Sequence, residues 1–229
     1  MEWAVTLTNM KIPDEMRAIP VRESDESLGD LRFRALMPAD DWASLPAPIR
    51  RRFSKRLAGG ETAVYSGEIV SCRMSRIGWC LAQFARLVGG PLPTSTDVRV
   101  PSVVAVTEDM ATGGQIWTRL HARRNGFPQI IHSAKRFRGS TGIEEYLGYG
   151  FGMALTIHAE RAALVFRSAS YFFQMLGRRI TLPSWLAPGA LTVTHSELGD
   201  GRFEFKLELD HSRFGALVRQ SAVFRETVS

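Results

Sequence analysis

Two adjacent glutamates, Glu144 and Glu145, are the residues of this sequence best suited to acid–base chemistry. They precede Tyr146 in a glycine-rich stretch, STGIEEYLGYGFG. A carboxyl group carried into an apolar pocket has a raised pKa and can serve as a general acid or base. Because most Asp and Glu side chains stay in water, we favour the alternative, in which both are surface carboxylates on a connecting segment.

Metal and nucleophile chemistry have no local signature in the chain. Cys72 and Cys80 fit no zinc spacing, and no G-x-S-x-G elbow presents a serine. The histidines are far apart and form no H-E-x-x-H pair: His121, His132, His158, His195 and His211. A sheet can gather distant histidines, but without ligand spacing we expect no metal site.

No nucleotide cofactor is expected either. GYGFG (148–152) contains glycines, but it lies between predicted strands rather than between a strand and a helix. A Walker loop is absent. The sequence therefore predicts no cofactor.

The chain carries a formal charge of +6, which comes mostly from arginine. Such a charge favours contact with anions, although a solvated basic surface is the simpler explanation. In QIWTRLHARR, strand alternation places Trp117, Arg119, His121 and Arg123 on one face. Together with KRFR (135–138) this face could bind single-stranded nucleic acid, but alternating arginine is also typical of a solvent face, and we expect no such binding.

An apolar row in GDGRFEFKLELD (199–210) raises the question of what the sheet encloses. Phe203, Phe205, Leu207 and Leu209 fall on every second residue, which predicts a strand with one apolar face. SYFFQML (170–176), with Trp185 and Leu186 beyond it, is also strongly apolar. These residues either fill a plain core or line a cavity, and LPSWLAP could form the rim of such a cavity.

The elements that must position these residues are mainly strands. From about residue 97, segments rich in Val, Ile, Thr and aromatics alternate with Gly-containing turns. Residues 140–152 are expected to be a bridge and residues 177–188 a loop. Strands are expected at 98–110, 115–124, 129–139, 190–198, 202–209 and 215–226. Residues 153–176 are most simply two strands about a turn near Glu160, although the middle of this segment could be helical. The last hairpin turns through Gly199-Asp200-Gly201.

Two helices are expected before these strands. In 75–90, Ser75 can cap the start, and Gly89, Gly90 and Pro91 end the helix. In 45–57, Ile49, Phe53 and Leu57 form a narrow apolar stripe among basic residues. That stripe resembles an interfacial helix for anionic membrane, but the helix is short, so docking on the sheet is the better prediction.

Short links between consecutive strands indicate an antiparallel meander. We therefore predict an α+β, β-dominated fold: a curved antiparallel meander sheet or half-open barrel wrapped around one main helix, 76–88. Residues 1–30 are expected to be a flexible leader and residues 31–229 a single domain. The two cysteines, the lack of a secretory h-region and the short apolar runs point to a cytoplasmic protein.

The order of several segments resembles that of a known family. FRALMPADDWASLPAPIRRRF precedes YSGEIVSCRMSRIGWCLAQFARLVGGPLP, and GQIWTRLH, GIEEYLGYGFGMALTI, LPSWLAP and DGRFEFKLELDHSRFGALVRQSAVF follow. This order is similar to that of the bacterial domain of unknown function 4166 family. Members of that family occur alone or behind an oxidoreductase domain like saccharopine dehydrogenase. The resemblance implies at most an oxidoreductase partner and carries over no activity or catalytic residue.

The leading hypothesis is a non-catalytic binding module for a hydrophobic or amphipathic, lipid-like small molecule. Arg119 or Arg123 would meet an acidic head group. One alternative is an enzyme or accessory domain that acts on such a ligand through Glu144 or Glu145, and another is a protein-interaction domain that partners an oxidoreductase. The expected lining residues are mainly aromatic: Trp79, Phe84, Trp117, Tyr146, Phe166, Phe172, Trp185, Phe203 and Phe205.

Overall fold

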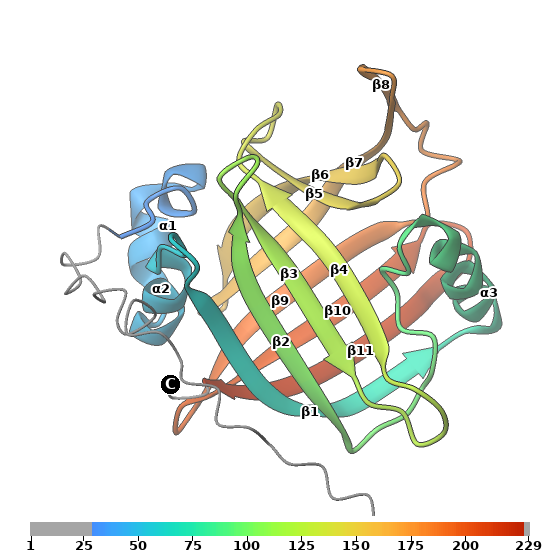
Figure 1. Cartoon of the computed structure of the whole chain (residues 1–229), viewed down its shortest axis with the longest axis horizontal. Helices are drawn as coiled ribbons and strands as arrows, with labels where there is room; N and C mark the ends of the chain where they lie inside the picture. Colours follow the sequence, from blue (N-terminus) through green and yellow to red (C-terminus); the bar gives the residue numbers. More distant parts are fainter. Residues whose placement is uncertain (1–28, 227–229) are drawn as a thin grey trace, which may run out of the picture.

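The computed structural model describes residues 29–226, and these residues form a closed antiparallel β-barrel (Figure 1). The expected leader, residues 1–30, lies almost entirely outside the described residues. Ten of the eleven strands are hydrogen-bonded in the order β6-β5-β4-β3-β2-β1-β11-β10-β9-β7. Pairing of β6 with β7 joins the two ends of this order and closes the ring.

The strands run through most of the chain, and the eleventh, β8, extends β7 outside the ring. Their bounds are β1 (Thr62–Met74), β2 (Val100–Asp109), β3 (Gly114–His121), β4 (Gln129–Arg136), β5 (Ile143–Gly148), β6 (Phe151–Glu160), β7 (Ala163–Met175), β8 (Arg178–Thr181), β9 (Ala190–Gly199), β10 (Arg202–His211) and β11 (Gly215–Glu226).

The helices lie at the two ends of the barrel. Figure 1 shows α1 (Ala39–Ser44) and α2 (Ala47–Ser54) at one end and α3 (Arg76–Ala85) at the other. Two 3-10 turns accompany them, η2 (Arg34–Leu36) and η3 (Arg86–Val88). No helix within residues 29–226 is long and apolar enough to cross a membrane.

The α1/α2 end of the barrel is filled by side chains. Phe33, Ile49 and Phe53 are buried, and Phe53 packs edge-on against the ring of His195 from β9. Docking of the 45–57 helix on the sheet is thus confirmed. Since its apolar stripe is buried, this helix cannot offer that stripe to a membrane.

An arginine ties α2 to the barrel wall. The Arg52 guanidinium lies 2.8 Å from His195 Nε2 and 3.0 Å from a carboxylate oxygen of Glu197. Its carbon also lies 4.0 Å from the centre of the Phe203 ring. Burial, and then the Arg52 charge, hold the pKa of His195 well below its usual value, so His195 is a neutral acceptor here.

Helix α3 covers the other end and touches the barrel through its smallest residue. Ser75 caps the helix by accepting a hydrogen bond from the Gly78 amide at 3.0 Å, as the sequence predicts. The Ser75 amide itself donates to the Leu217 carbonyl of β11 at 2.9 Å. A Cβ on Gly78 would overlap that same carbonyl oxygen, so only glycine permits this contact.

Two parts of the predicted architecture are wrong. The barrel is closed rather than half-open, because β6 and β7 pair along their length. The barrel also does not wrap around the 76–88 helix: α3 lies at one end, and only Gly78 and Ala82 within it are buried. In a closed ring the apolar face of the sheet is turned inward and shielded by the strands opposite, so no central helix is needed to cover it.

Several elements were missed or misassigned from the sequence. The bridge at 140–152 contains β5 and the start of β6, and the loop at 177–188 begins with β8. Strand β1 and helix α1 had no prediction. The other expected strands, the turn near Glu160, the 199–201 hairpin and both predicted helices are confirmed.

The close approach of α3 to β11 gives a test of the fold. We expect Gly78→Ala to lower the thermal unfolding midpoint, although alanine is the better helix former by about 1 kcal/mol, because its Cβ must push the helix off the Leu217 carbonyl. Cys80→Ala, at an exposed position of the same helix, is the control and should leave the midpoint nearly unchanged. A stabilised Gly78→Ala protein would contradict the described docking.

Candidate functional site

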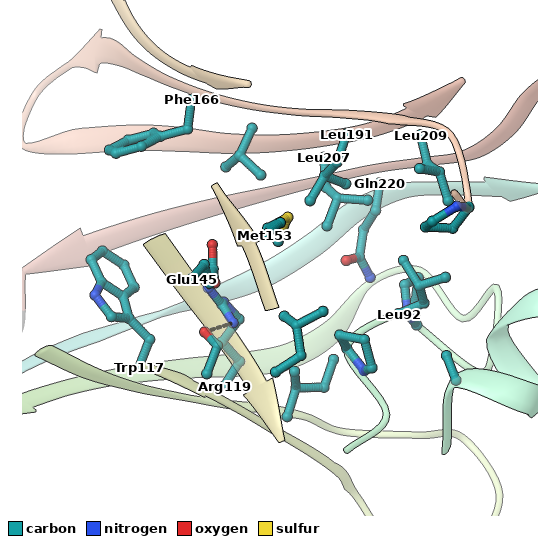
Figure 2. Close-up of a pocket in the computed structure, with 18 of the residues that line it drawn as sticks. Leu92, Trp117, Arg119, Glu145, Met153, Phe166, Leu191, Leu207, Leu209 and Gln220 are labelled. Atoms are coloured by element: carbon teal, nitrogen blue, oxygen red, sulfur yellow. Dashed lines mark hydrogen bonds and ion pairs between the residues drawn. The ribbon is translucent and has the colours of Figure 1, made fainter. Parts of the chain in front are cut away.

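The half of the barrel nearer α3 is hollow. It encloses a cavity of about 350 Å³, at the small end of the range of roughly 300–1,000 Å³ usual for small-molecule sites. Its lining is mainly apolar, and Leu191, Leu207 and Leu209 form one of its walls (Figure 2). Phe205, Leu207 and Leu209 of the β10 row face the cavity, whereas Phe203 is packed in the filled half.

A charged pair lies inside this apolar cavity. Lys135 of β4 and Glu145 of β5 are directly paired across the two strands, and Lys135 Nζ lies 3.3 Å from Glu145 Oε2. Both side chains are almost fully buried and both line the cavity. Met153 and Tyr171 continue the same cross-strand row onto β6 and β7.

Arg119 of β3 completes the charged cluster. Its guanidinium donates to Ser133 Oγ at 3.1 Å and lies 3.4 Å from Glu145 Oε1. Figure 2 shows the Arg119–Glu145 interaction as a dashed line, with Trp117 beside it. Lys135 Nζ also lies 4.6 Å from the centre of the Trp117 ring, which favours a cation at that place.

Electrostatics keep Glu145 ionised in spite of its burial. Burial alone would raise its pKa, but the charge of Lys135, then that of Arg119, and hydrogen bonds from Ser133 and Lys135 lower the pKa to about 2. Burial is also the main influence on Lys135 and lowers its pKa, with Glu145 opposing. A carboxylate held ionised is a poor proton donor near neutral pH, so the cluster is better suited to recognising charge than to acid catalysis.

His121 is a further titratable group that lines the cavity. Burial, and then the nearby Arg119 charge, lower its pKa to about 4, so the imidazole is neutral at pH 7. Its Nδ1 lies 2.8 Å from Ser102 Oγ, which orients the ring. Within residues 29–226, no three His, Cys, Asp or Glu residues gather as a metal site would require.

The cavity has its mouth beside α3. Phe84 and Val88 from the α3–η3 segment and Leu182 and Leu186 from the chain after β8 all line it. Phe84 and Leu186 are at the same time exposed to solvent, which places them at the rim.

Six of the residues singled out from the sequence meet at this cavity. They come from α3 and from strands β3, β5, β7 and β10: Phe84, Trp117, Arg119, Glu145, Phe166 and Phe205. Of the two glutamates, Glu145 points inward. Glu144 lies on the outer side, where Arg138 and Arg179 pair with its buried carboxylate. Neither glutamate is the free surface carboxylate that the sequence favours.

The other predicted lining residues are elsewhere. Trp79 and Trp185 are exposed, and neither lines the cavity. Arg123 lies beyond the end of β3, so the strand alternation no longer governs it, and it is exposed. Tyr146 packs edge-on against Phe172 on the outer face, and Arg179 stacks over the Phe172 ring.

A β-bulge explains why Phe172 is outside although Phe166 is inside. Leu155 pairs with Ser168 but Ala154 pairs with Ser170, so Ala169 is an extra residue in β7. The bulge reverses the alternation, and Tyr171 rather than Phe172 lines the cavity. A bulge leaves no clear mark in a single sequence, and this residue could not be found by counting.

Lys135 and Ser133 were missed for a different reason. Strand alternation within QIIHSAKRFRG places Ile131, Ser133 and Lys135 on one face, and the structure turns that face inward. A lysine on a strand is normally assigned to the solvent side. Ile131 alone did not mark the buried face, because Ile130 beside it is equally apolar and is 53% exposed on the other face.

A closed antiparallel barrel with an internal, largely apolar cavity defines a class of protein compatible with the binding of a small molecule. The family model described as Domain of unknown function (DUF4166) matches residues 45–224, and the chain belongs to this family. The match confirms the resemblance found in the sequence. No curated protein and no solved structure matches the chain.

The buried neutral His121 predicts a loss of stability in acid. The pKa of a histidine in the unfolded chain is about 6.5, whereas the pKa of His121 in the folded chain is about 4. Between these pH values the unfolded chain binds a proton at this residue and the folded chain does not. At pH 5 this single group should cost about 2 kcal/mol of unfolding free energy relative to pH 7.

Denaturant unfolding of the wild type and of His121→Gln at both pH values tests this expectation. The substitution removes the titration, so the free energy of the variant should fall less between pH 7 and pH 5. The difference between the two proteins at pH 7 gives the cost of the substitution itself. Parallel losses in both proteins would contradict the neutral, buried state of His121.

Proposed function

We propose that this protein is a binding module that holds a hydrophobic or amphipathic small molecule inside the barrel. The observation that carries the proposal is the cavity of about 350 Å³, which lies inside the ten-stranded barrel and is open beside α3. Transfer of an apolar ligand from water to such walls is favourable by roughly 25 cal/mol per Å² of apolar surface removed from water.

The chemistry of the walls supports binding over catalysis. The charged side chains in the interior are engaged with one another: Glu145 with Lys135 and Arg119. His121 is neutral and bonded to Ser102. Glu145, the carboxyl group that faces the cavity among residues 29–226, has a lowered pKa rather than the raised pKa that an acid catalyst needs. An oxidoreductase partner stays a prediction of the family resemblance.

A panel of ligands tests the proposal directly. Protein purified from cells should release a small amphiphile on solvent extraction, detected by mass spectrometry. After removal of this material, fatty acids, fatty alcohols and isoprenoids should raise the thermal unfolding midpoint by several degrees at saturating concentration. Clean protein with no midpoint shift across the panel would overturn the proposal.

A cavity-filling variant gives the matched control. Ala222 on β11 is buried and lines the cavity, so Ala222→Phe should place a ring in the space that the ligand needs. We expect ligand binding to weaken by at least tenfold, while the variant without ligand keeps its fold. Ala216→Phe, at an exposed position of the same strand, should bind like the wild type.

A further inference from the structure

The charges inside the cavity are unequal. Arg119 and Lys135 share one carboxylate, that of Glu145. The remaining charged lining residue, Lys206, is paired with Glu208 at 3.0 Å. One basic group in the interior therefore has no anion of its own among the described lining residues. A buried cation without a full counter-charge is costly, and a bound anion would remove that cost.

Arg119 is the member of the cluster that a ligand can reach. Its side chain is 26% exposed, whereas those of Lys135 and Glu145 are 7% and 8% exposed. A guanidinium has five N–H donors. The described hydrogen bonds use one to Ser133 and one, at 3.4 Å, to Glu145, which leaves donors for a further acceptor.

The space around Arg119 also matches an amphiphile. In Figure 2, Arg119 lies between Trp117 on one side and Leu92 on the other, with Leu191, Leu207 and Leu209 on the wall opposite. A ligand whose acidic group lies at Arg119 would therefore place its apolar chain beside these leucines, below the mouth at α3.

We infer that the ligand is an amphipathic monocarboxylate whose carboxylate pairs with Arg119 and whose apolar chain lies along Leu191, Leu207 and Leu209. This inference rests on the proposed binding function and specifies the class of ligand. A carboxylate supplies the single negative charge that the cluster lacks and accepts two parallel hydrogen bonds from a guanidinium. A phosphate monoester carries about −1.5 to −2 at pH 7 and exceeds that need.

Three probes with the same chain separate the outcomes: lauric acid, dodecanol and dodecyl phosphate, each below its critical micelle concentration, measured by titration calorimetry on lipid-free protein. We expect laurate to bind roughly 10- to 100-fold more tightly than dodecanol, since a charged hydrogen bond is made in one case only. Equal affinity of laurate and dodecanol, or tightest binding of the phosphate, overturns the inference alone. Failure of all three to bind overturns the proposed function as well.

Two arginines give a matched pair of variants. Arg119→Gln should lose the preference for laurate and keep dodecanol binding, whereas Arg123→Gln, exposed and outside the cavity, should behave like the wild type. Arg119→Lys keeps the charge without the fork and should retain part of the preference. An unchanged preference in Arg119→Gln contradicts the assignment, and the probe comparison on the wild type stands if that variant does not fold.

A different observation concerns the outside of the mouth. Large apolar side chains stand in solvent on both segments that border it: Trp79, Phe84 and Leu87 on the α3–η3 segment, and Trp185 and Leu186 on the chain after β8. Figure 1 shows this chain descending from β8 towards α3. Trp185 is 78% exposed and Leu87 is 75% exposed, which is unusual for residues of this size in water.

The charge of the two rim segments is one-sided. Between Glu68 and Asp97, and again between Glu160 and Glu197, the sequence contains no acidic residue. Arg76 and Arg86 are exposed on the α3–η3 segment. Exposed tryptophans among arginines, without acidic neighbours in the chain, match the apolar interior and the negative surface of an anionic bilayer.

We propose that the rim formed by α3, η3 and residues 182–188 docks on an anionic lipid surface, with the cavity mouth facing the membrane. The apolar rim is continuous with the cavity, because Phe84 and Leu186 belong to both. An amphiphile could then pass between bilayer and barrel without crossing water.

Sedimentation with vesicles tests the docking. The protein should bind phosphatidylcholine vesicles that contain phosphatidylglycerol, bind pure phosphatidylcholine weakly, and lose binding as salt is raised. Trp79→Ser combined with Trp185→Ser should weaken binding by about tenfold or more. Met110→Ser, 90% exposed in the β2–β3 turn and outside both rim segments, is the control.

No sedimentation, or equal sedimentation of the double variant, overturns the membrane proposal. A concentration-dependent dimer of the wild type that the double variant abolishes would assign the rim to a second copy of the chain instead.

Discussion

Pairing of β6 with β7 is the interaction on which the rest of the structure depends. It joins the first and last members of a ten-strand order, so every barrel strand has a neighbour on both sides. The sheet thereby closes and encloses an interior. Because side chains alternate along a strand, every second side chain points into the barrel interior. The α1/α2 end is filled by aromatic side chains such as Phe33 and Phe53, and the other end is left hollow.

The alternation also forces charges into the interior. Residues 115–121 and 129–135 carry Arg119 and Lys135 on the same faces as Trp117 and Ile131, so burying the apolar residues buries the basic ones too. Glu145 comes to lie directly opposite Lys135 on β5 and compensates part of this charge. Replacing such a cluster by apolar residues is often neutral or stabilising, so stability alone does not account for three charged groups in the cavity, whereas the proposed recognition of an anionic ligand would.

The fold was predictable as far as local patterns carry. Alternation gave the correct inner face of β10, and it grouped Trp117, Arg119 and His121 on one face of β3, although the sequence also allows that face to be a solvent face. Ser75 and Gly89 marked the ends of the α3 segment. Closure of the barrel was not predictable from the sequence, because it depends on pairings between strands that are distant in the chain, such as β1 with β11. The cavity residues likewise include some that local patterns predict and others that they do not. Strand alternation is enough to place Trp117, Arg119 and Phe205 in the cavity. In β7, by contrast, the extra residue Ala169 shifts the alternation, so that Tyr171 lines the cavity where Phe172 was expected.

Strand β8 lies outside the closed ring of the barrel. It pairs with β7 alone, so one of its edges is free along its whole length. Its four residues are all exposed, and Arg178 and Arg179 stand at its start. A short, charged edge is a poor template for adding a strand from another molecule, so the β8 edge offers little to ordered aggregation.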